Sequence, residues 1–171
     1  FEEILEGKNN HSEHLLATIE KGLQQVKISM RDFEEIIVGI GPGAYTGLRI
    51  SLTVAKMFAW TLKIKLYTIS SLDLIASGFF KSNGIYVIMT KAKKDYVYGK
   101  VLEVNNGEYL TLLPEGFFLK SDFLEKIKDF NYKYLITETE FNYNSLFIPE
   151  SLLIEVKDIV FLEPNYLRGE M

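Results

Sequence analysis

The sequence predicts an α/β protein made of two halves, divided between residues 83 and 84. Three observations lead to this fold class. Residues 36–40 form a β-branched run interrupted only by glycine, which is typical of a parallel-sheet strand buried on both faces. Segments with a helical spacing of apolar residues precede and follow that strand. Beyond residue 84 the pattern changes to extended runs and a hairpin, so a second sheet is expected there.

The first half, residues 1–83, reads as strand, helix, strand, helix, strand, helix. These elements are expected over residues 1–6, 11–25, 36–40, 46–62, 66–69 and 71–78. Asn10 is the expected N-cap of the first helix, with Glu13 three residues later as its capping-box partner. The hydroxyl of Ser70 or Ser71 can satisfy a free backbone N–H in the first turn of the third helix.

The second half, residues 84–171, reads as three strands, a helix and a strand, followed by a weaker strand and an irregular tail. Strands are expected over residues 85–89, 96–104, 109–113, 134–137 and 152–156, and a helix capped by Ser121 over residues 122–130. Asn106 and Gly107 supply the positive φ angles of a tight hairpin turn. With two strands added in front of the first half, both halves would be variants of one ribonuclease-H-like unit. The first half is therefore interpreted as lacking its opening hairpin.

The composition is that of an ordinary globular protein and excludes several classes. The 171 residues are 47% hydrophobic and 25% charged, with a net charge of -4. An acidic chain is unsuited to general nucleic-acid binding, which needs a basic face. The sequence has no cysteine, which excludes disulfides, cysteine-bound zinc and thiol nucleophiles, and a reducing, cytoplasmic location is expected. No apolar run reaches the roughly 18 to 20 residues of a membrane span, so no contact with a membrane is expected.

A glycine-rich loop follows the strand at residues 36–40 and opens the helix at residues 46–62. A strand, a glycine turn and a helix start place unpaired N–H groups at one spot, which is a usual setting for an anion. The residues fit neither a Walker loop nor the dinucleotide fingerprint. The alternative is a structural turn, with Gly43 in a left-handed conformation and Gly47 allowing close helix packing. Both interpretations stay open for the candidate residues Gly41, Pro42, Gly43, Thr46, Gly47 and Arg49.

The helix expected at residues 46–62 is apolar nearly all round, and only Arg49 and Lys56 are charged within it. One side can cover its own sheet, so the other side needs a second cover. That cover is either another subunit or the first helix of the same chain. The candidate residues for a partner interface are His11, Leu15, Leu16, Ile19, Leu48, Leu52, Ala55 and Ala59.

Catalytic and metal-binding residues are not predicted. His11 and His14 are the only histidines, and two imidazoles without a third ligand make a poor metal site. A catalytic triad cannot be assembled, because both histidines lie at the start of one helix. The turn of residues 91–94 carries three lysines and reads as a basic patch or a solvated loop.

Four segments carry a resemblance to a known family. They are His11-Ser12-Glu13 at the start of an apolar helix, the loop of residues 39–49, Ser70-Ser71-Leu72 after a short strand, and the terminal Pro164-Asn165-Tyr166-Leu167-Arg168. Together these segments resemble the TsaB family, also called YeaZ. The loop, with the pattern Gly-Pro-Gly-x-[Phe/Tyr]-Thr-Gly-Leu-Arg, is the most specific of the four.

The resemblance implies an ASKHA fold, the fold of actin-like ATPases, with two ribonuclease-H-like lobes. It also implies a role in making the N6-threonylcarbamoyl group of adenosine 37 in tRNAs that read codons starting with A. In that family TsaB is a non-catalytic partner of its paralogue TsaD, which carries the metal and the transfer chemistry, and the ATPase TsaE takes part. The resemblance therefore implies that ATP and a divalent metal belong to the partner subunits and that the chain meets tRNA only through the complex. The chain alone is expected to be a homodimer, because the helix at residues 46–62 has more apolar surface than one sheet can cover.

The sequence departs from the family's pattern in three places. The opening strand with an Asp-Thr-Ser-like turn has no counterpart here, so ATP chemistry by this chain alone is not expected. The motif usually written Asp-Ala-Arg-Arg reads Lys91-Ala92-Lys93-Lys94, which removes a candidate carboxylate from the interface between the lobes. The stretch before the terminal motif is short, so the closing helix of the family is expected to be reduced or missing.

Two classes of function remain open. The first is an interaction protein, a scaffold whose first two helices bind TsaD or a second copy of the chain. The second is an enzyme, either an ASKHA phosphotransferase or ATPase that uses the glycine loop, or a peptidase, an activity proposed for the family. A phosphotransferase needs carboxylates that hold magnesium near the loop, and the motif segments contain none.

Overall fold

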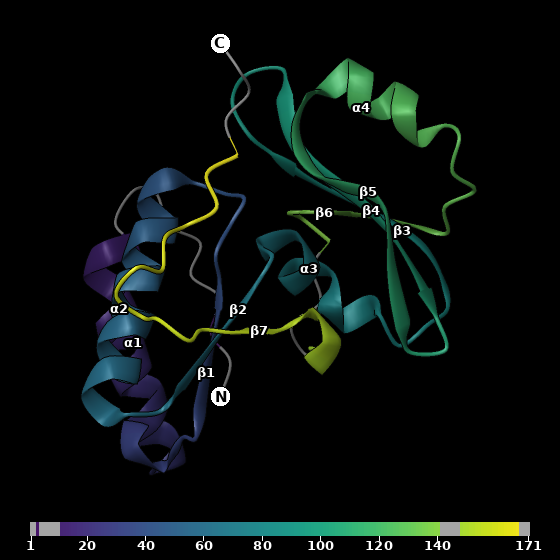
Figure 1. Cartoon of the computed structure of the whole chain (residues 1–171). Helices are drawn as coiled ribbons and strands as arrows, with labels where there is room; N and C mark the ends of the chain where they lie inside the picture. The colour runs from purple at the N-terminus through teal and green to yellow at the C-terminus, as the bar shows by residue number, and fades with distance from the viewer. Residues whose placement is uncertain (1–2, 4–10, 141–147, 168–171) are drawn as a thin grey trace.

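Two mixed β-sheets with helices packed against them make up the protein (Figure 1). The computed structural model describes residues 3, 11–140 and 148–167. The first sheet has the strand order β1-β2-β7 and the second has the order β5-β4-β3-β6. The strands are β1 (Glu35–Gly39), β2 (Lys65–Ile69), β3 (Gly84–Lys91), β4 (Tyr96–Asn105), β5 (Glu108–Leu119), β6 (Tyr134–Thr137) and β7 (Ile154–Glu155). The helices are α1 (His11–Val26), α2 (Tyr45–Leu62), α3 (Ser71–Ala76) and α4 (Lys120–Ile127), with 3-10 turns at Met30–Asp32, Ser77–Phe79 and Glu150–Leu152.

The first sheet joins two parallel strands to a short antiparallel one. β1 and β2 are parallel, with Val38 opposite Thr68, and α2 forms the crossover between them. α2 packs on one face of this sheet, and α1 lies beside α2 (Figure 1). The apolar cluster between α2 and the sheet contains Val38, Leu52, Ala55, Ala59 and Leu66.

The second sheet is covered on both faces. α3 covers one face, where Leu72 and Ala76 are fully buried against strands β3, β4 and β6. α4 covers the other face, where Phe123 and Ile127 pack with Val87, Val97 and Val101. α3 therefore lies between the two sheets, as Figure 1 shows, and it starts next to the loop that follows β1.

Most of the predicted elements are present, and the local signals that predicted them are visible. Ser70 is the N-cap of α3, because its hydroxyl accepts the N–H of Leu72 at 3.3 Å. Asn106 and Gly107 have φ angles of 51° and 86°, as a tight β4–β5 hairpin requires. The expected cap Asn10 and nearly all of the expected strand at residues 1–6 lie outside the described residues.

Two predictions about elements are wrong. β1 is half-buried rather than buried on both faces, because it is the outer strand of the described sheet. Ser121 does not cap α4, which has Leu119 as N-cap, and the hydroxyl of Ser121 donates to Asp122 instead. The strand expected at residues 152–156 is present in shorter form as β7, and it pairs with β2 of the first sheet. The chain returns to the first sheet at this point, although the boundary at residues 83 and 84 stays a prediction.

Within the described residues, no helix has both the length and the apolar composition that crossing a membrane requires.

Candidate functional site

The glycine loop, residues 40–44, joins β1 to α2 and is attached to α3. Gly41 has a φ angle of 118°, and the bond between Gly41 and Pro42 is cis. The N–H of Gly41 donates to Ser71 Oγ at 3.0 Å, and its carbonyl accepts the N–H of Ser71 at 2.8 Å. A Cβ on Gly41 would lie 2.5 Å from the carbonyl oxygen of Asn165. Both the φ angle and the close approach of Asn165 require glycine at this position.

Gly43 and Gly47 do not have the roles expected for them. The positive φ angle of the loop is at Gly41 and not at Gly43, because Gly41 is the residue that passes against the C-terminal segment. A Cβ on Gly43 would meet only Leu48, at an ordinary contact distance of 3.7 Å. Apart from its chain neighbours and the backbone of its own helix, a Cβ on Gly47 would meet none of the described residues within 4 Å, so close packing against another described element does not explain this glycine.

The start of α2 is held by aromatic contacts. Its N-cap is Ala44, no side chain caps the first turn, and Thr46 is exposed. The guanidinium of Arg49 donates to the Tyr45 hydroxyl at 2.7 Å and lies 5.2 Å from the centre of the Tyr45 ring. The Tyr45 ring in turn lies 5.0 Å from the ring of Tyr166 in the C-terminal segment. Arg49 is therefore engaged with Tyr45 at the junction of α2 and this segment.

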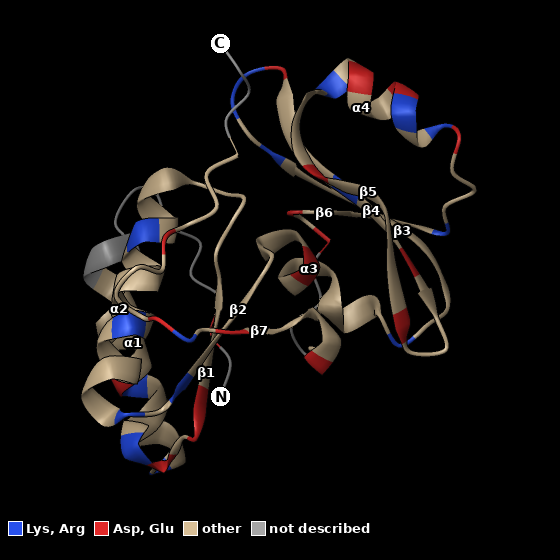
Figure 2. Cartoon of the chain, in the orientation of Figure 1, with Lys and Arg blue, Asp and Glu red and all other residues tan. Residues whose placement is uncertain are grey.

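A hollow of about 270 Å³ brings the glycine loop and the basic turn together. Its lining residues are Gly43, Ala44, Tyr45, Lys91, Ala92, Lys93, Tyr98, Tyr166 and Leu167. Figure 2 shows the lysines in the connection between β3 and β4 that forms one side. Lys93 Nζ lies 5.0 Å from the ring centre of Tyr96 and 5.4 Å from that of Phe117, so stacked aromatic rings hold this ammonium group. Two lysines beside tyrosine rings are suited to an anionic ligand.

The residues expected at a partner interface are not gathered on one surface. Leu48, Leu52, Ala55 and Ala59 are buried inside the chain, three of them in the cluster beneath α2. On α1, Leu16 is exposed, whereas Leu15 and Ile19 are half-buried. The side chain of His11 lies outside the described residues. A helix that is apolar nearly all round has no polar stripe, so its sequence does not tell which side faces its own sheet.

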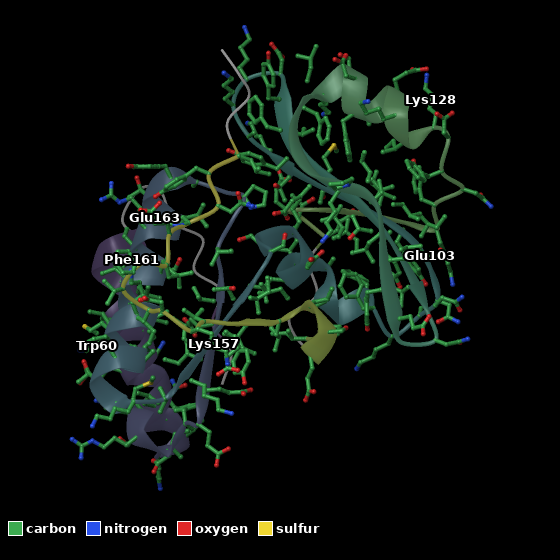
Figure 3. All side chains as sticks on the ribbon, in the orientation of Figure 1. Trp60, Glu103, Lys128, Lys157, Phe161 and Glu163 are labelled. Carbon is green, nitrogen blue, oxygen red and sulfur yellow. The ribbon has the colours of Figure 1, made fainter. Side chains whose placement is uncertain are left out.

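The exposed side of α2 carries other residues, which the sequence reasoning missed. Thr53, Met57 and Trp60 lie at helical spacing and are exposed, Trp60 by 67%. Val160 and Phe161 of the C-terminal segment are also exposed, Phe161 by 80%, and Figure 3 shows Phe161 and Trp60 along the same side of the molecule. We call Thr53, Met57 and Trp60 the outer face of α2. Its tryptophan is the one signal that could have identified this face, because a large apolar ring is costly to expose.

A buried ion pair joins α3 to the second sheet. Lys100 Nζ of β4 lies 2.6 Å from Asp73 Oδ2 of α3, and both residues are buried. The other oxygen, Asp73 Oδ1, has no hydrogen-bond partner among the described residues. Burial raises the pKa of Asp73, and the neighbouring Lys100 opposes that shift. No group of three or more histidine, cysteine, aspartate or glutamate side chains that could hold a metal exists within the described residues.

Comparison with known proteins gives a consistent result. The family model described as TsaD, tRNA N6-adenosine threonylcarbamoyltransferase, matches residues 5–149. The chain is 31% identical to the tRNA threonylcarbamoyladenosine biosynthesis protein TsaB of Bacillus subtilis over 122 residues, which cover 71% of this chain and 53% of that protein. It is 25% identical to the TsaB protein of Buchnera aphidicola subsp. Acyrthosiphon pisum over 163 residues, which cover 94% of this chain and 69% of that protein. The chain thus spans about half to two thirds of the length of these curated relatives.

Two solved structures share the fold. One is an uncharacterized protein described as similar to the peptidase YeaZ from Pseudomonas aeruginosa. It has a TM-score of 0.67 and 18% identity, with 96% of this chain and 92% of that chain covered. The other is YeaZ from Pseudomonas aeruginosa, with a TM-score of 0.59 and 23% identity over 68% of this chain and 60% of that chain.

Proposed function

Because the chain belongs to the TsaB (YeaZ) family, within the wider group that the TsaD model describes, we propose that it is a non-catalytic scaffold subunit in tRNA N6-threonylcarbamoyladenosine synthesis. The single observation that carries this proposal is the family match over residues 5–149, which includes the glycine loop. In this proposal the chain binds and supports a TsaD-like paralogue together with a TsaE-like ATPase. It meets tRNA only as part of that complex.

The fold is part of the same proposal. The two mixed sheets and the likeness to YeaZ support an ASKHA fold with two ribonuclease-H-like lobes, residues 1–83 and 84–171. β7 then belongs to the sheet of the first lobe although its residues come from the second segment.

The outer face of α2 is the surface on which the TsaD-like protein would dock. It exposes Met57 and Trp60, and Leu16 of α1 is exposed as well, alone among the residues expected at the partner interface whose burial the structure describes. Large apolar side chains that a monomer leaves in water mark interaction surfaces. In the absence of the paralogue, a second copy of the chain would use the same face, which gives a homodimer.

The chemistry is assigned to the partners. ATP hydrolysis and metal-assisted transfer need carboxylates beside the phosphates, and the lining of the hollow at the glycine loop, in the described residues, supplies lysines and tyrosines. That donor set does not fit a divalent metal, which supports placing the metal on a partner subunit. ATP is placed on the partner subunits because the family resemblance implies it.

An autonomous phosphotransferase or ATPase is the second candidate, and the hollow with Lys91 and Lys93 is the observation that favours it. Turnover of ATP by the purified chain separates the candidates. ATPase activity that follows the protein through purification and is lost in Lys93→Ala would favour the enzyme.

Co-expression with the TsaD-type protein of the same organism tests the scaffold proposal. The expected result is that the two proteins elute together in size-exclusion chromatography, with a molar mass above that of either alone. Separate elution at tens of micromolar would reject the proposal.

A further inference from the structure

Glu115 of β5 is hydrogen-bonded to two segments that are far apart in the sequence. The Asn165 side chain of the C-terminal segment donates from Nδ2 to Glu115 Oε1 at 2.7 Å. The Ser70 hydroxyl, at the start of α3, donates to Glu115 Oε2. The groups are partly buried, where a carboxylate that accepts two hydrogen bonds is held more strongly than on an open surface.

Asn165 is also bound through its backbone to the glycine loop. Its N–H donates to the carbonyl of Ile40 at 2.7 Å, and its own carbonyl lies against Gly41, where a Cβ would come within 2.5 Å. The side chain of Asn165 therefore reaches the second sheet while its backbone reaches the loop after β1. One residue connects the two halves.

The remainder of the C-terminal segment lies along α2. Lys56 Nζ donates to the carbonyls of Val160 at 2.9 Å and Leu162 at 3.1 Å. The ring of Tyr166 packs on Tyr45 in the first turn of α2. Residues 160–167, which we call the strap, thus touch α2 at two places and the glycine loop at a third.

We propose that Glu115 holds the strap closed and thereby couples the second sheet to the glycine loop and α2. Glu115 and Asn165 are positioning residues in this proposal, because neither lies on the outer face of α2. Phe161 is exposed and lies between the two strap carbonyls that Lys56 of α2 binds, on the same side of the molecule as Trp60 (Figure 3). The arrangement of the second sheet therefore influences the surface offered to a partner. This last step rests on the proposed docking of a TsaD-like protein, whereas the closure of the strap does not.

The substitution Asn165→Asp tests the closure, because it places a second carboxylate against Glu115. We expect hydrogen–deuterium exchange in residues 160–167 and 40–44 to become about tenfold faster or more, as the loss of a hydrogen bond to a charged group predicts. The double variant Glu115→Gln/Asn165→Asp reverses donor and acceptor and keeps the native net charge. In it the Gln amide can donate to the Asp carboxylate, and Ser70 can donate to the Gln oxygen, so exchange should return close to the native rate.

A matched control uses the far end of the same hairpin. Asn105 and Glu108 are exposed and lie opposite each other at the β4–β5 turn, so Asn105→Asp and Glu108→Gln/Asn105→Asp make the same changes away from the strap. Both should leave the exchange of residues 160–167 unchanged. Native exchange in Asn165→Asp, or fast exchange in both the single and the double variant, would overturn the closure by Glu115.

The affinity for the TsaD-type protein tests the coupling. We expect it to fall about tenfold in Asn165→Asp and to recover in the double variant. If the native chain binds and the strap loosens but the affinity does not change, the coupling to the partner surface is wrong. If the native chain does not bind at all, the proposed function fails, and the exchange experiment still decides whether Glu115 closes the strap.

Discussion

Replacing Lys100 by methionine removes the cation that faces Asp73 and keeps most of the side-chain volume. The carboxylate then stays buried without a counter-charge, and losing one partner of a buried ion pair costs about 3 to 5 kcal/mol. We expect the free energy of unfolding of Lys100→Met to fall by that order at neutral pH. Urea titration followed by circular dichroism measures this change.

The loss of unfolding free energy in Lys100→Met should become smaller at acid pH. Burial raises the pKa of Asp73, and removing Lys100 removes the group that opposes this shift. A group with a raised folded-state pKa contributes stability below its unfolded pKa and loses it as the pH rises through its folded pKa. Between about pH 7 and pH 4, Lys100→Met should therefore regain stability relative to the native chain. Asp73→Asn/Lys100→Met should show no such recovery, and a loss independent of pH in the single variant would contradict the role of Asp73.

Replacing Gly41 tests whether the glycine loop is held against Asn165 of the strap. In Gly41→Ala the new Cβ meets the carbonyl of Asn165 and the backbone keeps a φ angle disfavoured for alanine, which together should cost roughly 1 to 3 kcal/mol. Gly43→Ala is the matched control, because its Cβ meets Leu48 at an ordinary distance. Thermal unfolding measures the stability of both variants, and Gly41→Ala should lose more stability than Gly43→Ala. Equal losses would show that the loop is not held against the strap at Gly41.

The sequence predicts that this loop is special but assigns the wrong glycine to the strained angle. The reason is that the constraint on Gly41 comes from Asn165, 124 residues later, and local spacing contains no information about it. The pairing of Asp73 with Lys100 is hidden for the same reason, since each residue alone reads as an ordinary surface charge.

At the scale of elements, α2 is the helix on which the proposed function depends. Trp60→Glu puts a charge on the outer face and should leave the melting temperature nearly unchanged while weakening binding to the TsaD-type protein by tenfold or more. Leu110→Glu is the matched control, because Leu110 on β5 is exposed to a similar extent, 59% against 67% for Trp60. Normal binding by Trp60→Glu, or equal weakening by both variants, would place the partner elsewhere.

A substitution at Ala59, the neighbour of Trp60, distinguishes a loss of folding from a loss of partner binding. It is 1% exposed and packs in the cluster beneath α2, so Ala59→Glu should unfold the chain rather than only release a partner.

The sequence predicts the bounds of α2 to within one residue from its apolar run. It does not predict the orientation, because every side of this helix is apolar enough to face a sheet.

For the whole molecule, the sequence predicts the order of helices and strands well. It does not predict that the C-terminal part of the chain packs back on the first sheet and on α2. The β-branched run, the Asn-Gly turn and the serine cap of α3 act locally, so β1, the β4–β5 hairpin and α3 appear where expected. β7 and the strap cross back to the first sheet and to α2, and these contacts connect residues about 90 to 120 positions apart. The same holds for the candidate site, where only the part marked by a local sequence pattern is predicted. The loop is found, but Glu115, Asn165 and the outer face of α2 are not.

We have proposed that the chain takes part in making N6-threonylcarbamoyladenosine. The most direct measurement is the amount of this nucleoside in total tRNA, determined by mass spectrometry before and after the chain is depleted in its own organism. We expect the modified nucleoside to fall on depletion and to be restored by the native chain and by Leu110→Glu, but not by Trp60→Glu. An unchanged amount of the modified nucleoside after depletion would contradict it.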